Sequence, residues 1–150
     1  MAYTVTADPT VAFVDAVKAK LSADTVLAAL VTGIYGHLSE AARVDYPYIV
    51  LGRRHADNSA GAAMQLPGQL VTLQLDVWSD EKGPFVATNI CSRIYRTLQR
   101  QPLTVSGFSL IGGSLERTMQ DVFDEPDADK PGNVLYHGVQ LWSAVIHESL

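Results

Sequence analysis

Hydrophobic and polar residues alternate between Leu70 and Ser79, and this is the clearest pattern in the chain. The apolar positions are Val71, Leu73, Leu75 and Val77, and the polar positions between them are Thr72, Gln74 and Asp76. Successive side chains of a β-strand point to opposite faces of a sheet. The pattern therefore predicts a strand of antiparallel type, with one face buried and the other in contact with water.

A helical pattern follows directly, from Pro84 to Arg100, and Pro102 ends it. On a helical wheel of about 100° per residue, apolar and polar side chains fall on opposite sides. The apolar side holds Ala87, Ile90, Cys91, Ile94 and Leu98, and the polar side holds Asn89, Ser92, Arg93, Arg96 and Arg100. This helix is expected to pack one face on the core and to offer the other to solvent or to a neighbouring chain.

Two further helices are predicted near the start of the chain. Aspartate is a good N-cap and proline is tolerated at the first helical position, so Asp8 and Pro9 predict a helix that runs to about Ser22. Asp24 can cap a second, shorter helix. Gly33 is expected to end that helix in the left-handed conformation, and residues 34–35 to continue in extended form.

The remaining pattern is one of strands and turns. Residues 46–52 read as a strand that begins just after a proline, whereas residues 53–68 are small and polar with no sustained period, which predicts a long loop at the tip of a hairpin. Residues 103–111 predict a small hairpin whose second arm continues to Val122, with a bulge or break at Gly112 and Gly113. Residues 124–132 predict an acidic turn, and residues 134–146 alternate as a last long strand.

Composition narrows the class of protein. A chain of 150 residues is expected to form a single domain that needs no disulfide, and the only cysteine, Cys91, fits a reducing compartment. The net charge of -5 argues against a protein that binds nucleic-acid phosphates tightly. It suits a channel through which DNA passes without being bound. Only 18% of the residues are charged, so self-association is plausible. With no targeting segment or membrane span, we expect assembly in a cytoplasm.

The histidines and acidic residues do not form a recognisable metal site. His37, His55, His137 and His147 give no pair at ligand spacing, and the last two would lie roughly 33 Å apart on a shared strand at ~3.3 Å per residue. The segment that begins at Asp127 imitates the opening of a calcium-binding loop. Its fifth position is a proline, however, and its twelfth is a glycine where a glutamate is required. We expect no metal.

Catalytic motifs are equally weak. Residues 107–111 lack the final glycine of a nucleophile elbow, and no glycine-rich phosphate-binding loop occurs in the sequence. Cys91 falls on the apolar side of its predicted helix, where a thiol is usually an inert packing residue. We therefore expect no catalytic residue and no cofactor.

Three arginines lie close together on the polar side of the same helix: Arg93, Arg96 and Arg100. One interpretation is a solvated face. The other is a stripe that forms salt bridges with an acidic neighbouring subunit, whose candidate partners are Asp121, Asp124, Glu125 and Asp127.

Four segments together resemble the phage tail-completion proteins, the tail terminators of long-tailed phages with non-contractile tails, of related prophages and of gene-transfer particles. The segments are DTVLAALVTGIY at 24–35, YPYIVLG at 46–52, LQLDVWS at 73–79 and YHGV at 136–139. Each is a strand or turn pattern without chemistry. The resemblance lies in their order and spacing over nearly the whole chain.

This resemblance implies an α+β fold, a mostly antiparallel β-sheet with two main α-helices packed on one face and a long hairpin excursion. It also implies a structural virion protein of the tail or neck. Such a protein forms a hexameric ring that caps the tail tube, stops its polymerisation and joins the tail to the head. The implied partners are further copies of the chain, the tail tube protein, a head-closure or connector protein, and DNA that passes through the lumen without specific binding. Neither a membrane nor a cofactor is implied.

Eleven residues are candidates for an interface or for the lumen of such a ring. They are Arg53, Arg54, His55, Asp57 and Asn58 of the long loop, Arg93, Arg96 and Arg100 of the arginine stripe, and Asp124, Glu125 and Asp127 of the acidic turn. Another neck component, such as a head-closure or head-tail joining protein, is the nearest alternative function. A small-molecule-binding α+β domain is a more distant one.

Overall fold

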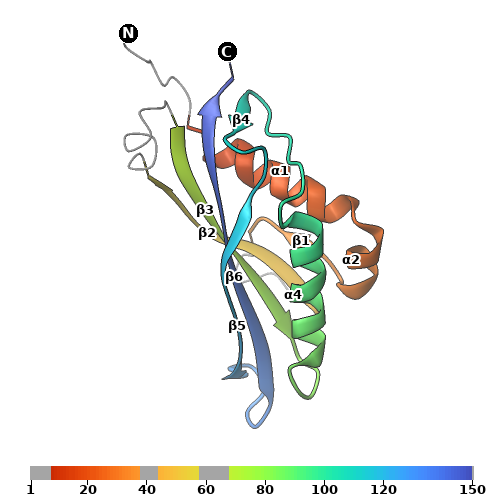
Figure 1. The fold of residues 1–150 in the computed structure, drawn as a ribbon. Coiled ribbons are helices and arrows are strands. Elements are labelled where there is room, and N and C mark those ends of the chain that lie inside the picture. The colour runs from red at the N-terminus through yellow and green to blue at the C-terminus, as the bar shows by residue number, and fades with distance from the viewer. Residues whose placement is uncertain (1–7, 38–43, 58–67, 150) are drawn as a thin grey trace.

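A curled β-sheet with helices on one side forms the body of the molecule (Figure 1). The computed structural model describes residues 8–37, 44–57 and 68–149. The helices are α1 (Thr10–Ala23), α2 (Thr25–Leu30) and α4 (Phe85–Leu98). The strands are β1 (Ile34–Tyr35), β2 (Tyr48–Asp57), β3 (Gly68–Ser79), β4 (Phe108–Leu110), β5 (Glu116–Pro126) and β6 (Val134–Glu148).

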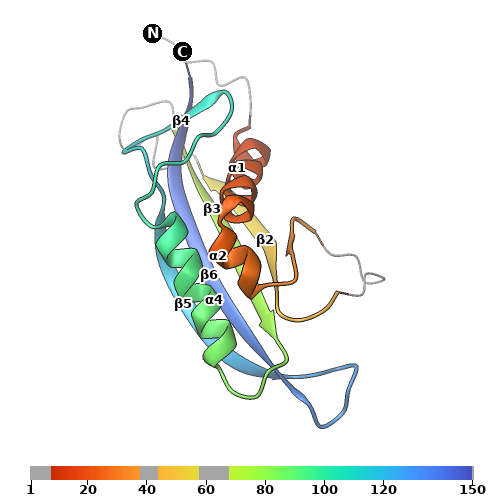
Figure 2. The same ribbon diagram turned by 90° about the vertical axis from the view of Figure 1, so that its right-hand side faces the viewer.

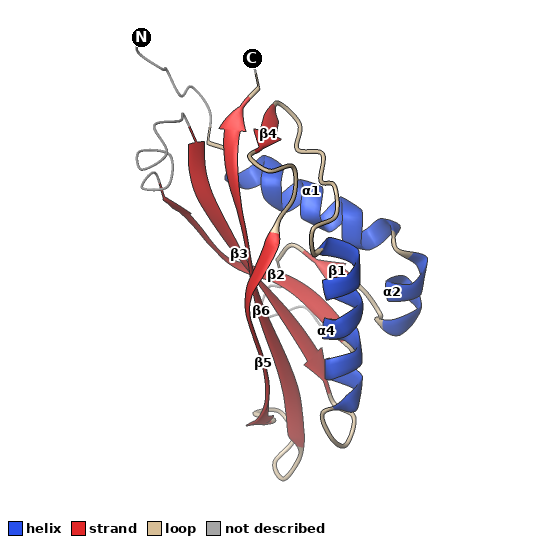
Figure 3. Ribbon diagram, in the orientation of Figure 1, coloured by secondary structure: helices blue, strands red, loops and turns tan. Residues whose placement is uncertain are grey.

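The longest strand, β6, lies inside the sheet. On one side it pairs with β3, which pairs in turn with β2, and on the other side it pairs with β5 and then β4 along its length. These pairs are antiparallel, whereas the short β1 pairs with β2 in parallel. The three helices cover the same face of the sheet (Figures 2 and 3). The α+β fold with a mostly antiparallel sheet and helices on one face is therefore confirmed.

The alternating segment forms β3 as predicted. Val71, Leu73, Leu75 and Val77 are fully buried and face the helices, while the residues between them are half-buried on the opposite face. We call this opposite face, away from α1, α2 and α4, the outer face. The last strand is also confirmed: β6 pairs with β3 from Tyr136 to His147 and with β5 from Val134 to Ser143.

The predicted helix forms α4, and its five apolar residues are all buried. Its end differs from the prediction. The helix stops at Leu98, because Gln99 is extended and Arg100 adopts a left-handed conformation with φ of 53°. In that conformation the Arg100 amide donates to the Leu115 carbonyl at 3.2 Å. Arg100 therefore leaves the helix, and the predicted stripe of three arginines on one helical face is wrong.

The two N-terminal helices are confirmed, with Phe13, Val14, Val17 and Leu21 of α1 buried. Asp8 Oδ1 accepts from the Thr10 amide at 2.8 Å, and Asp24 accepts from two amides at the start of α2. The expected left-handed Gly33 is wrong. The Gly33 carbonyl accepts from the Ile49 amide at 3.1 Å, so the chain enters the sheet here instead of closing the helix with a turn.

The first hairpin is confirmed, but its strands are longer than predicted. Residues Arg53 to Asp57, which the sequence places in the loop, continue β2, and Gly68 begins β3. The reason is visible in their burial: residues 53–56 are exposed on both faces, so no alternation marks them as a strand. The rest of the predicted loop, residues 58–67, lies outside the described residues.

Two corrections apply after α4. A bridge joins Val105 to Phe108 as in a small hairpin, but β4 pairs with β6, and Gly112 and Gly113 at positive φ separate it from β5. The acidic segment is also not wholly a turn. Asp124 and Glu125 belong to β5, and the turn occupies residues 127–133.

Gln140 is a buried polar residue that ties α4 to the sheet. Its Nε2 donates to the Cys91 carbonyl at 2.9 Å and to Gln120 Oε1 at 2.7 Å, and its Oε1 accepts from Trp142 Nε1 at 3.0 Å. The buried amide is thus satisfied within the core. Burial also raises the pKa of the Cys91 thiol to about 12, which makes Cys91 an unreactive packing residue.

Candidate functional site

A group of polar and aromatic side chains occupies the outer face where β3, β6 and β5 run side by side. His137 of β6 lies between two carboxylates: its Nε2 is 2.7 Å from Asp76 Oδ1 of β3, and its Nδ1 is 3.2 Å from Glu125 Oε1 of β5. The imidazole ring stacks on Trp78 at a centroid distance of 3.8 Å and also contacts Phe123. These residues, Asp76, Trp78, Phe123, Glu125 and His137, are called the His137 clasp below.

The clasp depends on close backbone approach and on charge. A Cβ atom at Gly52 would lie 2.5 Å from Asp76 Oδ2, so glycine leaves room for this carboxylate beside β2. Burial of His137 opposes its protonation, but the hydrogen bonds to Asp76 and Glu125 outweigh burial and raise the pKa of His137 above its ordinary value. Since a protonated imidazole can donate from both nitrogens, the charged form links three strands.

The stability of the protein is expected to depend on pH through this clasp. The proton is held more tightly in the folded chain than in the unfolded chain, where the pKa of histidine is about 6.5. The contribution is therefore complete below that pH and is lost as the pH rises through the higher folded pKa. The unfolding free energy of the protein minus that of a His137→Phe variant, measured by urea denaturation between about pH 5 and 9, should fall with rising pH.

Phenylalanine keeps an aromatic ring against Trp78 but has no titratable nitrogen. His37, His55 and His147 are present in the unchanged protein and in the variant, so their contributions cancel when one unfolding free energy is subtracted from the other. A difference that is flat or rises with pH would contradict the proposed protonation of the clasp.

A basic hollow of about 380 Å³ lies over β2, β3 and β6. Its lining is Arg53, Arg54, His55, Thr72, Gln74 and Leu141. The first three are candidate interface residues from the sequence, and the structure brings them together in β2. Asp57 is the last residue of the same strand, and Asn58 lies outside the described residues.

Two of the three arginine candidates, Arg93 and Arg100, form ion pairs within the chain. Arg93 donates from Nε and Nη2 to the two carboxylate oxygens of Asp24, at 2.8 and 2.9 Å, and Thr97 donates to the same carboxylate. The hydrogen bond from Arg93 holds the pKa of Asp24 far below its usual range. Arg100 pairs with Glu116 at 3.1 Å. Arg96 has no ion pair among the described residues.

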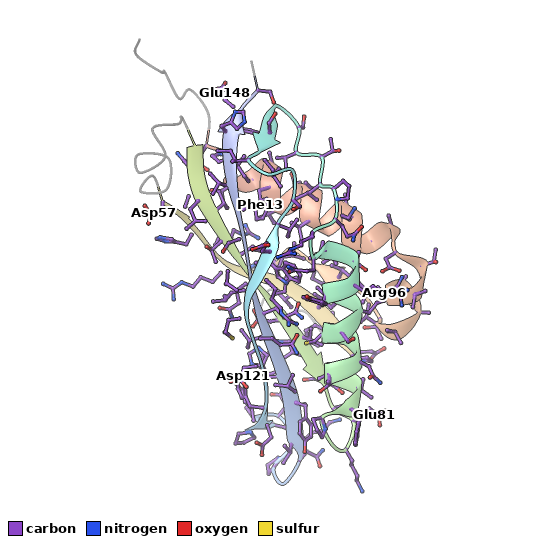
Figure 4. The ribbon with its side chains drawn as sticks, viewed as in Figure 1. Phe13, Asp57, Glu81, Arg96, Asp121 and Glu148 are labelled. Atoms are coloured by element: carbon purple, nitrogen blue, oxygen red, sulfur yellow. The ribbon has the colours of Figure 1, made fainter. Side chains whose placement is uncertain are left out.

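The acidic candidates are divided between the two faces. Glu125 is engaged in the clasp, Asp124 is exposed on the adjacent position of β5, and Asp127 accepts from the Asp129 amide within the turn. Asp121 projects from β5 on the outer face, on the side of the molecule opposite Arg96 (Figure 4). The arginine residues of α4 and these acidic residues therefore do not meet within one chain.

The described residues contain neither a metal-binding cluster nor a membrane-spanning helix. No group of three or more histidine, cysteine, aspartate or glutamate side chains is arranged to hold a metal in the part of the chain that the structure describes. Across the same residues, no helix has both the length and the apolar character that a membrane span requires.

The chain is thus a small α+β protein. Its exposed charged side chains lie on strands and sheet edges where other protein chains can bind. A model of the tail completion protein gp17 family matches residues 15–147, and the chain belongs to this family. It is therefore a structural protein of the phage tail. This confirms the resemblance drawn from the four sequence segments.

Comparison with solved structures gives the same fold. A chain of the structure entitled "Virion of native gene transfer agent (GTA) particle" has a TM-score of 0.75 and 22% sequence identity. The similarity covers 97% of this chain and 100% of that one. No curated protein matches the chain.

Proposed function

We propose that this protein is a tail terminator: a single-domain subunit of a hexameric ring that caps the tail tube, stops its polymerisation and joins it to the head. The observation that carries the proposal is the family match over residues 15–147, together with a fold that spans the same residues. On this proposal the protein acts by binding other chains, without catalysis. Its partners are the tail tube protein, a head-closure or connector protein, and further copies of itself.

The charge of the chain supports a role around DNA. A net charge of -5 does not attract phosphates, so a ring of such subunits would let DNA pass without holding it. The ring would be assembled in the host cytoplasm and kept in the virion at the junction of tail and head.

Two measurements test the terminator. Native mass spectrometry of the purified chain is expected to give a species of six times the 16.2 kDa of one copy. Removal of the gene is expected to give tails longer than normal, because nothing would stop the tube. Tails of normal length beside unattached heads would contradict the terminator and favour another neck component. A monomer that binds a small metabolite would contradict both.

A further inference from the structure

The two outer strands of the long antiparallel part of the sheet each have a stretch that pairs with no other strand in the described part of the chain. The order of this part is β2, β3, β6, β5. On β2, the short β1 pairs only with Ile49 and Val50, and the Gly36 carbonyl after it accepts from Arg54 Nη2 at 3.1 Å. On β5, Gln99 accepts from the Arg117 amide and so covers only the first residues. Residues 52–56 and 118–126 therefore present strand edges, which are templates for pairing with another chain.

The two edges carry opposite charge. Residues 52–56 contain Arg53, Arg54 and His55, and one acidic residue, Asp57, follows them at the end of β2. Residues 118–126 contain Asp121, Asp124 and Glu125 and no basic residue. Asp121 and Asp124 are exposed and form no ion pair with the described residues. Like charges directly opposite each other destabilise a strand pair, so pairing of β5 with β5 or of β2 with β2 is disfavoured. Pairing of β5 with β2 is favoured.

The direction of the strands also fits. Since each of the four strands is antiparallel to the next, β2 and β5 run in opposite directions. A second copy rotated about an axis parallel to the strands therefore brings its β5 antiparallel to β2 of the first. This contact joins two different patches, and such heterologous contacts close into rings when the rotation allows it.

Side chains match on both faces if His55 lies opposite Asp121. Arg53 lies in a β-bulge between Leu51 and Arg54, and on the outer face it then comes next to Phe123 and Asp121. Phe123 and Met119, which are 36% and 39% exposed, become covered. On the helix side, Arg54 lies opposite Val122 and diagonal to Asp124. Long side chains can reach such diagonal neighbours, which are roughly 7–8 Å away.

We propose that copies of this chain associate by sheet extension, with β5 of one copy adding to residues 52–56 of β2 in the next, so that Arg53 and Arg54 meet Asp121 and Asp124. This proposal depends on the hexameric ring proposed above, and it identifies the pairing of β5 with β2 as the contact between neighbouring subunits. The paired stretch of five residues spans about 16 Å.

Charge reversal tests the pairing. Arg53→Glu with Arg54→Glu makes both edges acidic, and Asp121→Lys with Asp124→Lys makes both edges basic. Each double variant is expected to stay monomeric in native mass spectrometry while its circular dichroism and thermal melting remain those of a folded chain. In a one-to-one mixture of the two variants, an acidic edge meets a basic edge only where one variant lies beside the other. The mixture is therefore expected to restore a ring of six with three copies of each.

Arg96→Glu is the matched control, because it reverses an exposed arginine on the opposite side of the molecule (Figure 4). It is expected to leave the ring intact. Rings that persist in both double variants, or a mixture that stays monomeric, would overturn sheet extension while leaving the terminator standing. A wild-type chain that forms no ring would instead contradict the terminator itself.

Cysteine pairing tests the register. His55→Cys and Asp121→Cys, purified separately and mixed under mild oxidation, are expected to form a disulfide between the two variants. Residues directly opposite each other can have Cβ atoms as close as about 4.5 Å, which a disulfide can span. Buried Cys91 is not expected to compete. Asp121→Cys alone should give no covalent dimer. A dimer of Asp121→Cys alone, or none in the mixture, would show that the strands do not pair in this way.

Discussion

Replacing Leu75 by aspartate is expected to abolish cooperative folding. Leu75 is fully buried in the middle of β3, opposite Leu51 of β2 on one side and Gln140 of β6 on the other. An unpaired carboxylate there costs several kcal/mol, which is comparable with the roughly 5–15 kcal/mol that stabilises a typical folded protein. Circular dichroism during heating should show no cooperative transition.

Val11→Asp is the matched control for this change. It makes the same substitution type on α1 at a side chain that is 69% exposed, and the variant is expected to melt close to the unchanged protein. A Leu75→Asp protein that is soluble and melts cooperatively would show that the inner face of β3 is not the core.

Trp142→Ala is expected to destabilise the protein by about 4 kcal/mol, since truncating a buried aromatic residue leaves a cavity. Trp142 is fully buried on the helix-facing side of β6, and its Nε1 donates to Gln140 Oε1. The loss therefore combines missing packing with a buried amide oxygen that has lost its donor. Urea denaturation should show the midpoint moving to lower urea concentration.

Trp142→Phe separates the two contributions, because it removes the indole nitrogen but keeps a ring in the core. A loss of about 1–2 kcal/mol is expected for this variant. Equal losses for alanine and phenylalanine would mean that the hydrogen bond to Gln140, and not the packing, accounts for the stabilising effect of Trp142.

The elements that the sequence predicts well are those with one uniformly buried face. β3 and α4 each lie against a continuous core, so their apolar residues recur at the period of a strand or a helix. The second half of β2 has no such face. Arg53 and His55 project toward solvent, so a strand there looks like a loop until its hydrogen bonds to β3 are known.

The candidate site shows the same limit. The charged residues of the two edges were found from the sequence, but their position on opposite outer strands follows from the strand order. The His137 clasp was missed because its residues come from three strands, and only the register brings Asp76, Glu125 and His137 together. Arg93 was misjudged for a similar reason, since its partner Asp24 is 69 residues away in the sequence.

The packing of the three described helices on one face has a consequence for the evolution of the proposed ring. Rotation about a ring axis shows the same side of every copy to the channel. If the strands run along that axis, one wall of the ring is helical and the other is sheet (Figure 2). Substitutions on the helices would then alter one wall without touching the other. The lining that faces DNA and the surface that faces the surrounding medium could therefore diverge independently among related chains.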